Sequence, residues 1–107
     1  MKIYIKKEIE KIVSDLIRNY NPKLVVLFGS YAQDAYSENS DIDLLVIKET
    51  KKRPIWRRIA ARKAIDTNMP MDIIVYTPSE FKQLRMNNSP FIKEILSQGK
   101  ILYERHI

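Results

Sequence analysis

Apolar residues along this chain follow two alternating patterns. In some segments they recur every three or four residues between charged residues, which is typical of a helix with one buried face. In others they form continuous runs of Val, Leu and Ile, which is typical of strands covered on both faces. The predicted helices cover residues 5–20, 30–36, 54–66, a segment that begins at Thr77, and a segment that begins at Ser89 and closes at Gly99. The predicted strands cover residues 23–28, 41–47, 71–76 and 100–103.

Capping residues mark the boundaries of these segments. Asn21-Pro22 ends the first helix, and Pro54 opens the helix over residues 54–66. Thr77-Pro78-Ser79-Glu80 has the sequence of a capping box with proline at the first helical position. Ser89-Pro90 repeats the start signal, and Gly99 is expected to close the last helix in left-handed geometry.

The helix over residues 54–66 is expected to turn an apolar stripe inward. This stripe consists of Ile55, Trp56, Ile59 and Ala60. The alternation of helices and strands predicts an α/β (α+β) fold in which helices pack on a small mixed β-sheet. The sequence has 107 residues, 45% of them hydrophobic, which is enough for one core, so residues 1–107 are interpreted as a single domain.

Composition narrows the possible chemistry. Cysteine is absent, which excludes disulfides and thiolate metal sites and leaves the cytoplasm as the expected compartment. The only histidine is His106, so a serine–histidine–aspartate triad or a histidine-ligated zinc site is not expected. No segment reaches membrane-spanning length, and no membrane partner is expected. The net charge of +6 favours a polyanion, an acidic protein surface or a nucleoside triphosphate as the partner.

The first candidate functional feature is the pair Gly29-Ser30 at the end of a predicted strand. A strand that turns into a helix at this point leaves free backbone N–H groups, and glycine lets a phosphate approach without a Cβ in the way. Ser30 is expected to be the N-cap and to add a hydroxyl donor. Turns of this kind are common, so the pair indicates phosphate binding only in combination with the acidic residues that follow it.

Three aspartates on predicted strands form the second candidate feature. Asp41 and Asp43 lie two positions apart, so both side chains point to the same side of a strand. Asp43 stands inside an apolar run, where an unpaired charge is costly. Asp72 is the second residue of the strand over residues 71–76 and would meet Asp43 if the two strands are neighbours. Oxygen-only ligands favour Mg²⁺ or Mn²⁺, whereas capping or surface roles are the alternative for each acid.

These residues carry a resemblance to a known family. Gly29-Ser30-Tyr31-Ala32, then Ser40-Asp41-Ile42-Asp43-Leu44-Leu45-Val46, and Asp72 on a later strand resemble the minimal nucleotidyltransferase (MNT) branch of the DNA polymerase β superfamily. The order of elements along the chain fits the polymerase-β-like nucleotidyltransferase fold. The family pattern usually has Arg-Gly where this chain has Gln33-Asp34, which removes one possible phosphate contact, although aspartate can adopt the left-handed backbone of a glycine.

The resemblance implies a phosphoryl transfer that uses two Mg²⁺ ions. On this reading Asp41, Asp43 and Asp72 are both the catalytic and the metal-binding residues, and Gly29 and Ser30 bind the β- and γ-phosphates of ATP. Attack at the α-phosphorus then transfers AMP and releases pyrophosphate. Asp72 is implied to complete the second metal site and to assist in deprotonating the attacking hydroxyl group.

The resemblance also implies a partner, and two other interpretations stay open. Stand-alone MNT proteins are antitoxins of helical HEPN-type toxins, which implies AMP transfer to a tyrosine of such a toxin. The basic segment over residues 51–63 instead allows nucleic-acid binding, although Arg58 and Arg62 are expected on a solvated helix face and Trp56 in the core. A non-catalytic module that neutralises its partner by contact alone is the third interpretation.

Overall fold

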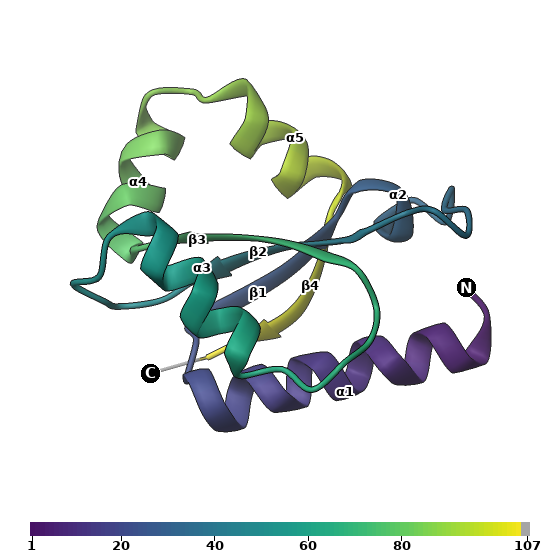
Figure 1. Ribbon diagram of the computed structural model, residues 1–107. Coiled ribbons are helices and arrows are strands. Elements are labelled where there is room, and N and C mark those ends of the chain that lie inside the picture. The colour runs from purple at the N-terminus through teal and green to yellow at the C-terminus, as the bar shows by residue number, and fades with distance from the viewer. Residues whose placement is uncertain (106–107) are drawn as a thin grey trace.

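The computed structural model describes residues 1–105, in which helices cover both faces of a four-stranded sheet (Figure 1). The helices are α1 (Ile3–Tyr20), α2 (Gly29–Ala32), α3 (Pro54–Lys63), α4 (Pro78–Met86) and α5 (Pro90–Gln98). The strands are β1 (Leu24–Phe28), β2 (Ile42–Ile47), β3 (Met71–Tyr76) and β4 (Lys100–Glu104). His106 lies outside the described residues.

The sheet is mixed, as the sequence predicts. Its strand order is β3-β2-β1-β4, with β2 and β3 parallel and β1 antiparallel to both of its neighbours. A parallel pair needs a crossover connection, and α3 supplies it between β2 and β3. The interior strands β1 and β2 are covered on both faces, which explains their continuous apolar sequences.

Two layers of helices bury the two faces of the sheet. In Figure 1, α1 runs below the sheet and α4 and α5 lie above it. The side chains of Ile12 and Ala61, from α1 and α3, pack with Leu44 in one core. Ile92 and Ile95 of α5 pack with Leu45 in the other. Because successive strand residues point to opposite faces, Asp43 projects from the same side as Leu45, toward α5.

Helix α3 turns a different side inward from the one predicted. Ile55 is 55% exposed and Trp56 is 58% exposed, whereas Arg57 and Ala61 are buried. The guanidinium of Arg57 makes two hydrogen bonds to the Glu80 carboxylate, at 2.6 and 3.2 Å. It also donates to the carbonyl of Lys52. Helical periodicity could not indicate this orientation, because the acid that lets an arginine be buried lies 23 residues further along the chain.

The helix boundaries agree with the capping signals except at the end of α5. Thr77 and Glu80 form the predicted capping box, with hydrogen bonds of 2.9 and 3.1 Å. Asn21 closes α1 with a left-handed φ of 53°. Gly99, however, has an extended backbone with φ of −80°, so its predicted left-handed geometry is wrong. Glycine is required there for space, since a Cβ would overlap the Ile95 carbonyl oxygen and stand 2.9 Å from that of Leu27.

Among the described residues, none of the helices combines the length and the apolar character needed to cross a membrane.

Candidate active site

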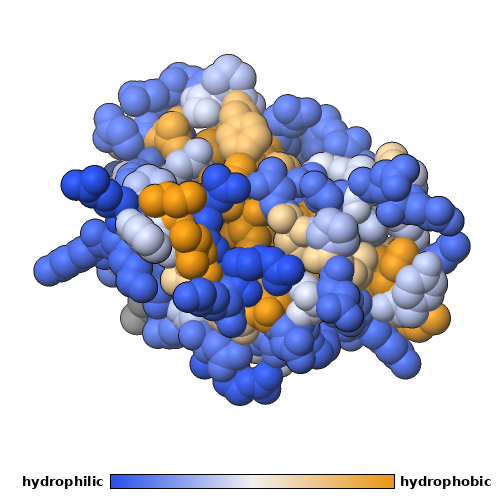
Figure 2. Space-filling model, viewed as in Figure 1, coloured by the Kyte–Doolittle hydropathy of each residue, from blue (hydrophilic) through white to orange (hydrophobic). Residues whose placement is uncertain are grey.

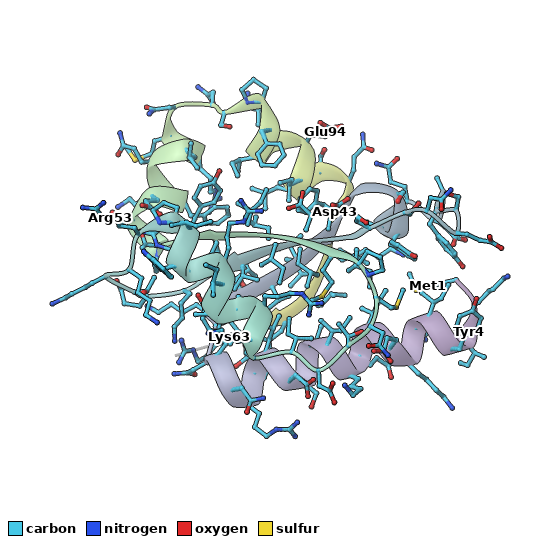
Figure 3. All side chains as sticks on the ribbon, in the orientation of Figure 1. Met1, Tyr4, Asp43, Arg53, Lys63 and Glu94 are labelled. Atoms are coloured by element: carbon cyan, nitrogen blue, oxygen red, sulfur yellow. The ribbon has the colours of Figure 1, made fainter. Side chains whose placement is uncertain are left out.

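Asp43 lies at the centre of the candidate site, and the strand register fixes its neighbours. It is aligned with Phe28 at the end of β1 and with Asp72 near the start of β3. Because β2 and β3 are paired in register, the side chains of Asp43 and Asp72 leave the same face of the sheet side by side. Figure 3 shows Asp43 on the face that α5 covers. Asp41 lies one residue before β2 and is exposed.

Gly29 closes the site against the carboxylate of Asp43. Its φ is 72°, in the left-handed region, and a Cβ on Gly29 would overlap Oδ2 of Asp43. Only glycine therefore lets the chain turn from β1 into α2 this close to the carboxylate. The turn brings the first backbone N–H groups of α2 and the Asp43 carboxylate to the same end of the sheet.

Helix α2 begins earlier and ends sooner than predicted. It covers Gly29–Ala32 with Phe28 as its N-cap, so the prediction of Ser30 as N-cap is wrong and Ser30 is the second residue of the helix. The chain leaves α2 through Asp34, whose φ of 55° is left-handed. Aspartate therefore adopts the backbone geometry for which the family pattern has glycine, as the sequence predicts.

Burial and neighbouring acids make Asp43 an unfavourable place for an uncompensated negative charge. The pKa of Asp43 is raised above its usual value, chiefly because burial removes water from the carboxylate. The negative charges of Asp72 and then Asp41 raise the pKa further. Asp72 and Asp41 are therefore close enough to Asp43 for their charges to act on its carboxylate.

Arg58 offsets part of this negative charge. Its guanidinium lies 3.6 Å from the carboxylate of Asp72, and the two side chains are 54% and 52% exposed. The sequence predicts Arg58 on a solvated helix face, and Arg58 is exposed, but the sequence does not predict this contact. No local signal could have revealed it, because the pair joins α3 to the edge strand β3 and depends on how the two pack together.

The chemistry of these residues fits a divalent cation, although they do not form a complete coordination site. Among residues 1–105, no three carboxylate, histidine or cysteine side chains are grouped closely enough to hold a metal ion as they stand. The structure instead brings Asp43 and Asp72 together, with Asp41 nearby. A half-buried carboxylate surrounded by like charge is stabilised by a cation, and carboxylate oxygens are the ligands that Mg²⁺ and Mn²⁺ prefer.

Comparisons with known proteins agree with this geometry. Residues 10–107 match the family described as "Polymerase beta, Nucleotidyltransferase". The protein adenylyltransferase MntA of Shewanella oneidensis is 30% identical over 97 residues, which cover 88% of this chain and 64% of MntA.

Two crystal structures of toxin–antitoxin complexes contain a chain with a similar fold. One is a mutant MntA–HpeT complex, with a TM-score of 0.64 and 28% identity over 90% of this chain and 73% of the other. The second is a toxin–antitoxin with AMP-PNP, with a TM-score of 0.57 and 28% identity over 91% of this chain and 74% of the other. The resemblance found in the sequence is confirmed, and the chain belongs to the polymerase β nucleotidyltransferase family.

Proposed function

We propose that this chain transfers AMP from ATP to a tyrosine hydroxyl group of a helical HEPN-type toxin and thereby acts as its antitoxin. The observation that carries the proposal is the in-register pairing of Asp43 with Asp72, next to a turn that only Gly29 can make. The name of the relative MntA supports protein adenylylation, and the toxin–antitoxin complexes support a toxin as the acceptor. A reaction that uses ATP would take place in the cytoplasm, which is the compartment we propose for this protein.

Asp41, Asp43 and Asp72 would hold two Mg²⁺ ions, for which Mn²⁺ could substitute. When bound, such ions neutralise the charge that develops on the attacking and leaving oxygens. The raised pKa of Asp43, caused by burial and by its acidic neighbours, supports this assignment. The mutant MntA–HpeT complex carries two Asp-to-Glu changes two positions apart, which is also the spacing of Asp41 and Asp43.

Gly29 and Ser30 would bind the β- and γ-phosphates of ATP. Backbone N–H groups at the start of a helix attract anions, and the Ser30 hydroxyl adds a further donor. The toxin–antitoxin structure with AMP-PNP supports an ATP-like substrate for this fold.

The transfer itself requires that the groups be held in position more than it requires covalent chemistry by the protein. The tyrosine oxygen forms a bond to the α-phosphorus of ATP, while the bond from that phosphorus to the bridging oxygen of the β-phosphate breaks. Pyrophosphate leaves, and the carboxylate of Asp72 accepts the proton of the hydroxyl group. Holding the nucleotide and the acceptor in this geometry supplies most of the increase in the rate of AMP transfer over the uncatalysed reaction.

The proposal is tested by the mass of the acceptor protein. The chain is incubated with ATP, Mg²⁺ and the purified protein encoded by the neighbouring gene, and the intact mass of that protein is measured. We expect a gain of one or more AMP groups, which Asp43→Asn abolishes. Asp66→Asn is the matched control, because the Asp66 side chain is fully exposed and belongs to the loop after α3.

Two outcomes would contradict the proposal. An unmodified acceptor that is inhibited stoichiometrically without ATP, by the wild type and Asp43→Asn alike, would indicate the non-catalytic module. Transfer of AMP to RNA with no change in protein mass would indicate a nucleic-acid enzyme.

A further inference from the structure

The outer side of α3 and the segment before it combine exposed basic residues with two large exposed apolar side chains, Ile55 and Trp56. Residues 51–63 contain seven Lys and Arg side chains and no Asp or Glu, whereas the whole chain has a net charge of +6. The rest of the chain is therefore nearly neutral. Arg57 and Arg58 are paired with Glu80 and Asp72. The other five basic residues are exposed, namely Lys51, Lys52, Arg53, Arg62 and Lys63.

Two hollows lie on either side of the exposed face of α3, and Ile59 and Lys63 line both of them. The larger, of about 530 Å³, lies between α3 and β3 and is walled by Ile55, Ile59 and Ile73. The smaller, of about 330 Å³, lies on the other side of this face, beside Trp56 and Ala60. Figure 3 shows Lys63 on α3, with Arg53 at the far end of the helix. In Figure 2, apolar atoms lie at the surface over α3 between hydrophilic ones.

We propose that this surface docks the acceptor protein through an acidic patch with apolar side chains at its centre. We call it the α3 surface, formed by Ile55, Trp56, Ile59, Arg62 and Lys63. The identity of the acceptor rests on the proposed function, whereas the chemistry of the docking partner follows from α3 alone. A basic rim selects an acidic partner, and large exposed apolar side chains mark a protein contact.

The linings of the two hollows favour a protein over a nucleic acid. Nucleic-acid surfaces combine positive charge with several aromatic faces on which bases stack. Here the apolar walls are mostly aliphatic, and within residues 1–105 Trp56 is the only aromatic residue that lines either hollow. Aliphatic hollows offer little to a phosphate backbone but accept Leu, Ile or Phe side chains of a protein, with Trp56 as the anchor.

The α3 surface is also close to the candidate active site. Arg58 belongs to the same helix and reaches the carboxylate of Asp72. It also lines the larger hollow. A protein seated on the α3 surface would therefore lie next to the edge of the sheet where Asp72 is found. Docking and AMP transfer can in this way use adjacent parts of the molecule.

Docking is measured by calorimetric titration of the chain into the protein encoded by the neighbouring gene, with EDTA and without ATP. We expect Trp56→Glu and Lys63→Glu each to raise the Kd at least about tenfold. The control is Met86→Glu, which places the same charge at an apolar side chain that is 66% exposed on α4, and it should change the Kd less than about twofold. Thermal unfolding of each variant verifies the fold. The wild-type Kd should also rise with salt.

Three results would overturn the proposal. They are a wild type that does not bind, α3 variants that bind as tightly as the wild type, and a Trp56 fluorescence change with single-stranded RNA but not with the protein. Loss of a homodimer in Trp56→Glu would likewise assign the surface to a second copy of this chain.

The experiments distinguish a wrong docking surface from a wrong proposed function. If the acceptor binds through Trp56 but gains no AMP, the proposed function is wrong and the docking surface stands. If the chain does transfer AMP to the acceptor, Trp56→Glu should raise the KM for the acceptor and leave kcat unchanged. Damage to the candidate active site would instead lower kcat.

Discussion

The carboxylate of Asp43 occupies the space into which a side chain on Gly29 would project. Gly29 also has a φ of 72°, a geometry that costs other residues about 1–2 kcal/mol. Two independent constraints, space and backbone geometry, therefore require glycine at the turn between β1 and α2.

Replacing Gly29 by alanine should damage both stability and the site. We expect Gly29→Ala to lower the free energy of unfolding by about 2–4 kcal/mol, because backbone strain and overlap with the carboxylate add together. Urea denaturation measures the loss. Ser30→Ala is the control, since it removes only a hydroxyl group from the same turn. An alanine variant as stable as the wild type would mean that Asp43 can move away freely.

Asp43→Asn should stabilise the protein when Mg²⁺ is absent. Burial and the charges of Asp72 and Asp41 raise the pKa of Asp43. Its ionised form therefore destabilises the folded state at neutral pH. Removing that charge raises the melting temperature in EDTA. Added Mg²⁺ should raise the melting temperature of the wild type and leave that of Asp43→Asn unchanged. A variant that is less stable than the wild type in EDTA would contradict this electrostatic description.

Glu80→Gln should destabilise the protein in a pH-dependent way. Hydrogen bonding to Arg57 and, more weakly, to the Thr77 backbone holds the pKa of Glu80 below its usual 4.5, against the effect of burial. Because the folded-state pKa is the lower one, the ionised group stabilises the fold above pH 4.5, and this contribution is lost as the pH falls through the folded-state pKa.

At pH 7 we expect Glu80→Gln to lower the free energy of unfolding by about 1–3 kcal/mol, because the buried guanidinium of Arg57 is left without its carboxylate. Urea denaturation from pH 7 to pH 3 should show the difference between wild type and variant shrinking toward acid. A difference that stays constant with pH would show that packing, and not charge, is what Glu80 contributes.

Arg58→Ala should affect cation binding more than stability. The pair with Asp72 is half exposed, and such pairs contribute less than about 1 kcal/mol. Arg58 competes with a cation for the same carboxylate, so the variant should bind Mn²⁺ without nucleotide up to about fivefold more tightly. Electron paramagnetic resonance of free Mn²⁺ measures the change. Arg62→Ala, one turn further along α3, is the control. Weaker binding by Arg58→Ala would show that the guanidinium helps to build the site.

Local signals predicted most of the fold correctly. The strand over residues 71–76 has the predicted bounds, and the capping box at Thr77 marks the start of α4, because both depend on residues that are neighbours in sequence. Strand alternation also predicts the face of β2 from which Asp43 projects. It does not place Asp41, because β2 begins at Ile42, and the roles of the three aspartates stay predictions.

Predictions failed where a distant partner decides the outcome. The sequence predicts Trp56 in the core, but Arg57 takes the buried side of α3 because it can pair with Glu80. Gly99 was expected to be left-handed, but it is needed because β1 passes close to the end of α5. Arg58 is exposed, as expected, but the sequence could not show that the crossover also brings it to Asp72.

Nucleotidyl transfer by this chain requires that a divalent cation and a nucleotide bind together at Asp43 and Asp72, and calorimetry tests this most directly. ATP is titrated into the wild type and into Asp43→Asn, each with Mg²⁺ and with EDTA. We expect saturable binding by the wild type only when Mg²⁺ is present, and no measurable binding by Asp43→Asn. Equal binding by the two proteins, or binding by the wild type that is the same in EDTA, would contradict it.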